Sequence, residues 1–323
     1  MKFTSIPESY SSFYDALPYT VDAEGAVGDI EIVVSDAASG ERLGTKTLCA
    51  AAGGTVDIAP MLRSVVSYRL PEGVERCAVV DTGAQLSVAV TANGTAAPTR
   101  KFIAARVDPG ALFTLLEAQC ERRTLAAGEY DLVSFFSMPD AVAEVVVEAF
   151  GSGYEFMTLE PPSGGQRTVA VTTRGFAEVP QRMAVTLRID GEAVAAIDYD
   201  VVENPSTARR VAWLDGQHAP EIYTFPVSCG MTVGASRRRC ITPEGRTTVA
   251  VERDTTLRVV SAYEPRAQLA ALAEIIVSPR VWLLEGDACR EVDVLTDTLM
   301  TAGCGALGSI AVTLRGRRKE VRL

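Results

Sequence analysis

The chain has 323 residues, of which 47% are hydrophobic and 22% are charged, and its formal net charge is −10. These proportions are those of ordinary globular proteins, so they exclude a disordered chain and a fibrous repeat. The negative charge argues against a general nucleic-acid binder, because neutralising phosphates requires a basic surface. A chain of this length is long for one domain, and we expect two or three.

The first nine residues contain one lysine and no apolar segment, so they predict no secretory signal. The longest apolar runs, such as residues 270–277, are far shorter than the roughly 18 to 20 residues of a membrane-spanning helix. We therefore expect no membrane span. The cysteines are odd in number and have no close pairs, which predicts reduced, mostly buried thiols in a cytoplasm. They are Cys49, Cys77, Cys120, Cys229, Cys240, Cys289 and Cys304.

Alternation of apolar and polar residues predicts β-strands from Ile30, Ile32 and Val34 onward. Residues 183–190 carry this pattern most clearly, and Asp190-Gly191 predicts a type I′ turn that leads into a second strand. The same alternation recurs at 169–171, 249–251, 257–259 and 310–314. Short strands separated by turn residues are typical of antiparallel sandwiches and barrels.

Helical periodicity is rare. Leu269, Leu272 and Ile276 form one apolar stripe within residues 265–277, and Ser278-Pro279 ends this predicted helix. Residues 110–119 have a weaker stripe, for which a helix and a non-helical segment are equally good interpretations.

Two polar stretches, residues 91–99 and 203–207, divide the chain. The predicted domains are an N-terminal β domain at 1–100, a middle β domain at 101–206, and a C-terminal β domain at 207–323 that contains the helix at 265–277. The expected fold class is therefore mainly β, with several antiparallel sandwich-like or barrel-like domains and one helix docked on the last.

The single histidine, His218, restricts the catalytic possibilities. A Ser-His-Asp or Cys-His relay would need it as the base, and no Gly-x-Ser-x-Gly motif accompanies it. A histidine in a polar turn is the simpler interpretation. We therefore predict no catalytic residue and no enzymatic activity.

Metal and cofactor motifs are also lacking. No Cys-x-x-Cys pair occurs, and Cys229 and Cys240 are expected to approach each other across a hairpin, where packing explains their spacing as well as metal binding does. The glycine-rich run 303–308 precedes a predicted strand, whereas dinucleotide binding needs a helix there. We expect no cofactor and no metal.

Paired carboxylates offer one alternative, a glycosidase. Asp198 and Asp200 share one face of a predicted strand, while Glu285, Asp287 and Asp293 crowd a turn that resembles no known calcium loop. Solvated surface charge is the favoured interpretation of both sets.

Positive charge is concentrated at Arg237-Arg238-Arg239 and in the last nine residues. A basic tail suits docking on an acidic neighbour, including a second copy of the chain. Protection of an edge strand against unwanted pairing is the alternative. The candidate interface residues are Arg315, Arg317, Arg318, Lys319 and Arg322.

Three aromatic residues, Trp213, Tyr223 and Trp282, would provide stacking platforms for sugar rings if they were exposed. They are the basis of a second alternative, a carbohydrate-binding or adhesin-like β protein.

The last third of the chain has a characteristic order of segments. Trp213-Leu214-Asp215-Gly216 comes first, then the helix that ends at Ser278-Pro279, then Val281-Trp282-Leu283-Leu284, and finally a strand at 309–315. This order resembles tail or baseplate proteins encoded by prophages of Bacteroides-like bacteria. Residues 55–62 are similar to an N-terminal feature of the same group.

The resemblance implies a non-enzymatic structural component of a phage or prophage tail or baseplate that acts through oligomeric protein–protein interfaces. Its partners would be other tail proteins or further copies of itself, and not nucleic acid. It would be located in the bacterial cytoplasm during assembly and then in the virion tail.

Overall fold

The computed structural model describes residues 1–108, 110–243, 245–286, 288–300, 306–317 and 320–322. Sheets dominate this part of the chain, and most of their strand pairs are antiparallel, which confirms the predicted mainly β fold with several sheets. No helix among these residues is long and apolar enough to cross a membrane.

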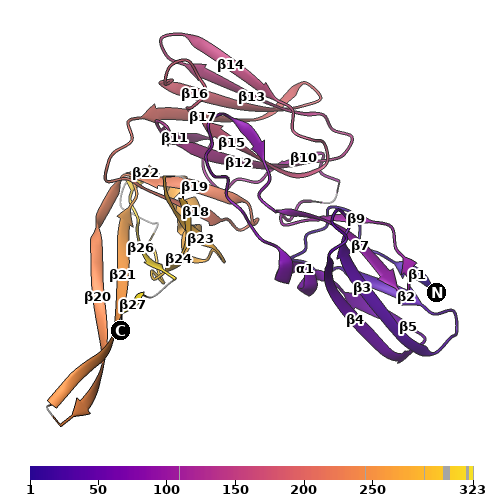
Figure 1. The fold of residues 1–323 in the computed structure, drawn as a ribbon. Coiled ribbons are helices and arrows are strands. Elements are labelled where there is room, and N and C mark those ends of the chain that lie inside the picture. Colours follow the sequence, from indigo (N-terminus) through magenta and orange to yellow (C-terminus); the bar gives the residue numbers. More distant parts are fainter. Residues whose placement is uncertain (109, 244, 287, 301–305, 318–319, 323) are drawn as a thin grey trace.

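Two antiparallel sheets form the N-terminal part (Figure 1). The smaller sheet contains β1 (Lys2–Ser5), β2 (Pro18–Asp22) and β5 (Gly53–Asp57), in that order. The larger sheet contains β4 (Arg42–Ala51), β3 (Gly28–Asp36), β7 (Gln85–Ala92), β8 (Thr95–Ala96) and β9 (Arg100–Ile103), with β9 paired to β7. The alternation in β3 buries Ile30, Ile32 and Val34 while Asp29 and Glu31 remain exposed, as the sequence predicts.

The middle part consists of two further sheets. One has the order β10 (Phe113–Leu115), β12 (Tyr130–Ser137), β15 (Gly165–Thr172) and β6 (Ala78–Val80). The other has the order β11 (Arg122–Ala126), β17 (Glu192–Val202), β16 (Arg182–Ile189), β13 (Ala143–Phe150) and β14 (Tyr154–Leu159). We call the second one the outer middle sheet. Valine side chains such as Val133, Val145 and Val169 fill a shared core between the two sheets.

The C-terminal part is a nearly closed barrel. Its order is β19 (Pro220–Phe225), β18 (Arg209–Leu214), β23 (Val281–Glu285), β24 (Ala288–Val294), β26 (Ala311–Gly316), β21 (Gly245–Val260) and β20 (Val227–Thr242), with β27 (Glu320–Arg322) also paired to β21. A short pair joins β22 (Glu264–Pro265) and β25 (Leu307–Gly308).

Helix α2 (Arg266–Ala273) and the 3₁₀ turn η1 (Glu274–Ile276) dock on the barrel. Leu269, Leu272 and Ile275 pack into its core beside Trp213 and Val312. This confirms the predicted helix at 265–277 and its docked position.

Local predictions had different outcomes. The Asp190-Gly191 turn is confirmed, with φ values of 52° and 87° between β16 and β17. A helix at 110–119 is wrong, because Phe113–Leu115 pair with β12 as a strand. A helix that the periodicity does not predict, α1 (Ala59–Val65), is too short to show a stripe. The domain boundaries stay predictions; β6, from before residue 100, pairs with β15 of the middle part.

Candidate interaction surface

The longest feature of the barrel is the β20–β21 hairpin, each strand of which has 16 residues (Figure 1). Near its base, β21 also pairs with β26 and β27, as far out as Val251. Beyond that point, the two strands pair only with each other among the residues described. We call residues 231–250 the hairpin arm; this range also includes the β20 residues 231–236, which lie opposite 252–257 of β21. Figure 1 shows that it projects well beyond the body of the molecule.

The arm carries apolar side chains that the molecule itself does not cover. Met231, Val233 and Ile241 are 62%, 52% and 82% exposed. Met231 and Val233 lie on the same face of β20, because side chains repeat every two residues along a strand. Exposed apolar residues on an unpaired strand edge are costly in water and mark surfaces that another molecule covers.

The outer end of the arm is basic. Arg237, Arg238 and Arg239 lie on β20 and Arg246 on β21, and all four are exposed. None of them has a carboxylate partner within the described part of the chain. The predicted arginine cluster therefore lies on the projecting hairpin with its side chains exposed, where a partner can reach it.

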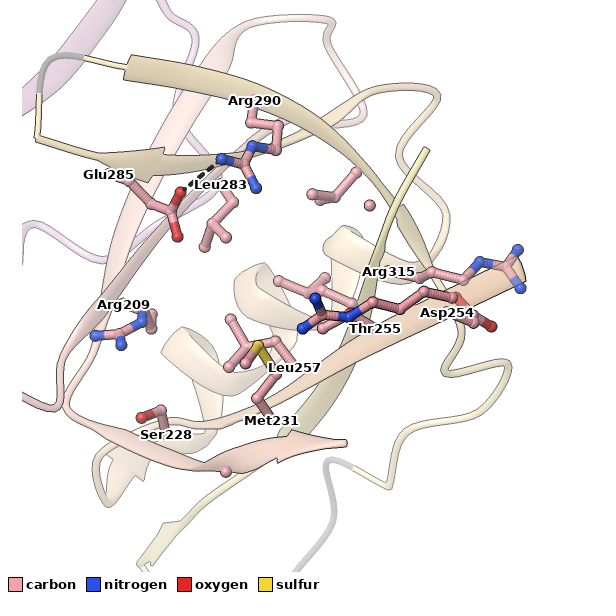
Figure 2. Close-up of a pocket in the computed structure, with 15 residues that line it drawn as sticks. Arg209, Ser228, Met231, Asp254, Thr255, Leu257, Leu283, Glu285, Arg290 and Arg315 are labelled. Carbon is pink, nitrogen blue, oxygen red and sulfur yellow. Dashed lines mark ion pairs between the residues drawn. The ribbon is translucent and has the colours of Figure 1, made fainter. Parts of the chain in front are cut away.

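A pocket of about 460 Å³ opens in the barrel at the base of the arm (Figure 2). Leu257, Leu283 and Met231 contribute apolar lining. The labelled charged side chains lie around them, with Arg209 on one side and the 3.2 Å Arg290–Glu285 ion pair on another (Figure 2). The pocket therefore continues the exposed apolar surface of the arm into the barrel.

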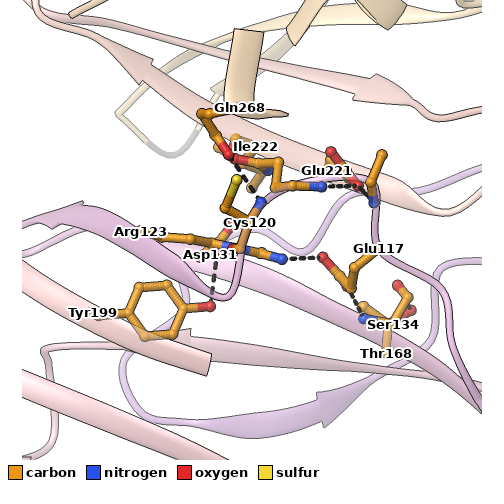
Figure 3. A network of polar contacts seen from close by, with 12 residues as sticks. Glu117, Cys120, Arg123, Asp131, Ser134, Thr168, Tyr199, Glu221, Ile222 and Gln268 are labelled. Carbon is orange, nitrogen blue, oxygen red and sulfur yellow. Dashed lines mark hydrogen bonds and ion pairs between the residues drawn. The ribbon is translucent and has the colours of Figure 1, made fainter. Parts of the chain in front are cut away.

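A buried polar cluster joins the middle part to the barrel (Figure 3). Arg123 on β11 donates hydrogen bonds to Glu117 at 2.8 Å and to Asp131 at 3.1 Å, and Tyr199 donates to Asp131 at 2.9 Å. Glu221 comes from β19 of the barrel and accepts the backbone N–H of Gln119 at 3.3 Å.

Burial controls the charge of this cluster. Desolvation raises the pKa of Glu117 to about 8, although Arg123 beside it opposes the shift. Desolvation raises the pKa of Glu221 well above its usual value, and Glu117 adds to the effect. One oxygen of Glu221 is buried and has no hydrogen-bond partner among the residues that the structure describes. These carboxyls are buried between the middle part and the barrel, so the cluster stabilises the contact between those two parts.

The predicted basic tail is partly engaged within the chain. Arg317 lies 2.6 Å from Glu291 and 3.2 Å from Asp293, and Arg315 lies 3.5 Å from Asp293. Arg322 belongs to β27, while Arg318 and Lys319 lie outside the described residues. An interface role for these residues stays a prediction.

The aromatic residues considered as stacking platforms lie mostly inside the molecule, so the two tryptophans lack the exposure that stacking on a sugar ring requires. Trp213 is fully buried in the barrel core. Trp282, 6% exposed, packs in a core that also contains Tyr68 of the N-terminal part. Tyr223 is half-buried and donates a 2.7 Å hydrogen bond to Glu264.

His218 lies in a turn, with a φ of 60°, and stacks on Tyr14 of the N-terminal part with ring centroids 3.5 Å apart. Burial lowers its pKa to about 4, with a smaller contribution from Arg106. The stacked neutral ring therefore helps to hold the N-terminal part against the barrel.

The carboxylates considered for catalysis or calcium are occupied by arginines. Asp198 pairs with Arg182 at 2.8 Å and Asp200 with Arg122 at 2.8 Å. Asp287 lies outside the described residues, as do residues 301–305 of the glycine-rich run. Within the described ranges, no group of His, Cys, Asp and Glu could hold a metal ion.

The cysteines also differ from expectation. Cys229 and Cys240 lie on the same strand, so they do not meet across a hairpin. Cys77 is buried, whereas Cys49 and Cys240 are exposed, so the prediction of mostly buried thiols is wrong.

The sequence analysis identified the arginine cluster at 237–239, but it did not predict the long β20–β21 hairpin that carries the cluster. The sequence contains a partial signal for it, because the turn residues 243–245 are followed by residues 246–260, which contain no glycine or proline, whereas Gly230 and Gly234 interrupt the stretch before the turn. No protein-family model matches the sequence, and no curated protein matches it either.

Proposed function

We propose that this chain is a non-enzymatic structural component of a phage or prophage tail or baseplate, and that it acts through protein–protein interfaces in an oligomer. The observation that carries the proposal is the hairpin arm, whose Met231, Val233 and Ile241 are left exposed by the described part of the chain. Exposed apolar surface of this kind is typical of protein–protein interfaces.

Two further observations support an assembly role. The chain is built from several β-sheets whose edge strands, such as β14 and β20, are free to pair with other chains. The resemblance of the segments from Trp213 to residue 315 to prophage tail and baseplate proteins gives the kind of assembly. On this proposal the partners are other tail proteins or further copies of the chain, assembled in the bacterial cytoplasm and then carried in the virion tail.

Removal of the outer part of the arm, together with Met231→Thr and Val233→Thr, tests the proposal, because the deletion alone would leave Met231 and Val233 in place. A variant in which residues 237–251 are replaced by Asn-Gly keeps Ser236 opposite Glu252 and closes the shortened hairpin with a type I′ turn. We expect it to fold, with unchanged circular dichroism, and to be lost from particles when it is expressed with the neighbouring genes. Incorporation of the shortened protein at the wild-type level would contradict the proposal.

The neighbouring genes provide an independent check. A tape-measure or tail-sheath gene beside this one agrees with the proposal. A polysaccharide-utilisation cluster in the same place would contradict it and favour the carbohydrate-binding alternative.

A further inference from the structure

Three exposed aromatic side chains lie together at the edge of the outer middle sheet. Phe150, Tyr154 and Phe156 are 37%, 55% and 65% exposed. Phe150 lies opposite Tyr154, and Glu148 lies opposite Phe156, so these four side chains share the outer face of the sheet. The ring centroids are 5.4 Å apart for Phe150 and Tyr154 and 6.2 Å apart for Tyr154 and Phe156. We call these four residues the aromatic patch.

The aromatic patch is acidic. Glu148 accepts a 2.7 Å hydrogen bond from Tyr154, which keeps a carboxylate beside the rings. Residues 105–206 contain 16 acidic and 7 basic side chains, a net charge of −9. The excess of acidic residues in this part of the chain favours a basic partner.

The arm has the opposite character. Residues 231–250 contain four arginines and one glutamate, a net charge of +3 in a chain whose net charge is −10. A guanidinium can stack on an aromatic face and donate hydrogen bonds to a carboxylate at the same time. The aromatic patch offers a guanidinium both kinds of contact, because the carboxylate of Glu148 lies opposite the ring of Phe156. On the arm, the exposed Ile241 near the arginines can add an apolar contact.

The edge position of β14 leaves room for a partner. β14 pairs with β13 on one side, and the described residues place no strand on its other side. Its outer backbone groups are therefore accessible to a docking hairpin.

The two surfaces cannot meet within one molecule. Figure 1 shows β14 at one end of the molecule and the tip of the β20–β21 hairpin at the opposite end. A contact between them must join two molecules, and each copy carries both halves.

We propose that the tip of the hairpin arm, with Arg237, Arg238 and Arg239, docks on the aromatic patch of a second copy of this chain. This inference rests on the proposed function, since it names the partner surface for the arm. The contact is head-to-tail, so repeating it generates a ring or a filament.

Sedimentation velocity of two variants tests the contact. The tip variant carries Arg237→Glu, Arg238→Glu and Arg239→Glu, and the patch variant carries Glu148→Gln and Phe156→Ser. We expect each to weaken self-association of the wild type by at least about tenfold, and added salt to weaken wild-type association in the same direction. The control variant carries Arg42→Glu, Lys46→Glu and Arg63→Glu at exposed positions of the N-terminal part. Its net charge changes by the same amount as that of the tip variant, and it should associate as the wild type does.

Mixing the two variants gives a signature of head-to-tail docking. Each variant associates only weakly alone, but each retains the half that the other lacks. We expect the mixture to form heterodimers and nothing larger, because a dimer of this kind has no intact surface left for growth.

Several outcomes would overturn the docking. One is a mixture that stays monomeric, and another is a patch variant that assembles as the wild type does. If that patch variant instead loses retention on a polysaccharide column, the aromatic patch is a glycan platform. A wild type that is monomeric at every concentration also overturns self-docking. Arm-dependent incorporation into tail particles would then still uphold the proposed function, so the two failures are distinguishable.

Discussion

The guanidinium of Arg123 lies 2.8 Å from the carboxylate of Glu117, and both side chains are almost completely buried, with exposures of 3% and 1%. Asp131 and Glu221 are buried in the same cluster. Three carboxyls thus share one cation, and burying the excess negative charge would be costly. Protons must therefore accompany the docking of the middle part on the barrel.

This cluster predicts that stability falls as the pH rises. The pKa of Glu117 is raised to about 8 in the folded protein, and that of Glu221 is also raised well above its usual value. A carboxyl whose pKa is higher in the folded than in the unfolded protein stabilises the fold fully at pH values below its unfolded pKa. This stabilisation is lost as the pH rises through the pKa of the folded protein. Urea unfolding should therefore give a free energy that decreases from about pH 5 to about pH 9.

The matched variants are Glu221→Gln, which removes one buried titration, and Glu192→Gln, which changes an exposed side chain. The first should flatten the pH dependence and the second should leave it intact. Equal slopes for the wild type and Glu221→Gln would refute the assignment.

Arginines at neighbouring positions should differ strongly in their contribution to stability. Arg123→Met leaves Glu117 and Asp131 buried without their cation, and we expect a loss of about 3 to 5 kcal/mol in the free energy of unfolding. Arg122, with a 77% exposed side chain paired to Asp200, provides the control, and Arg122→Met should cost less than about 1 kcal/mol. Chemical denaturation of both proteins measures the difference, and similar losses would argue against a buried cluster.

Trp213 should behave as a core residue. Trp213→Ala empties a fully buried site in the barrel and should cost about 3 to 5 kcal/mol in unfolding free energy. Tyr263, 77% exposed, is the control, because Tyr263→Ala should change stability by no more than about 0.5 kcal/mol. Soluble oligosaccharides should not shift the tryptophan emission of the wild type; a shift would show that a ring is accessible after all.

Thiol labelling should separate the cysteines by exposure. Cys49 and Cys240 are exposed and should react with a maleimide in the native protein, whereas Cys77 should react only on unfolding. Burial also raises the pKa of the Cys77 thiol, which lowers its thiolate fraction and slows the reaction further. Peptide mass mapping after timed labelling gives the order, and early modification of Cys77 would contradict its position.

Features encoded by neighbouring residues could be predicted from the sequence. The alternation in β3 and the Asp190-Gly191 turn depend on the period of a strand and on positive φ angles, both of which are local. The helix at 265–277 followed in the same way from its apolar stripe and from Ser278-Pro279.

Features that depend on distant contacts could not be predicted. Residues 113–115 form a strand because β12 pairs with them, although their own periodicity is ambiguous. Glu221 meets the backbone of Gln119 across 102 positions of sequence. The burial of Trp213 and Trp282 requires barrel closure and contact with the N-terminal part, neither of which has a local pattern.

The pairing of β11 with β17 is parallel, with Arg122 opposite Asp198, and this has a consequence for synthesis on the ribosome. β11 leaves the ribosome long before the strand that it needs, by roughly 4 to 15 seconds at ordinary elongation rates. The β16–β17 hairpin forms between neighbours as soon as it emerges, whereas β11 must wait beside it. A nascent chain that stops before residue 192 therefore keeps an unpaired strand, which is the arrangement that recruits strands from other unfinished chains.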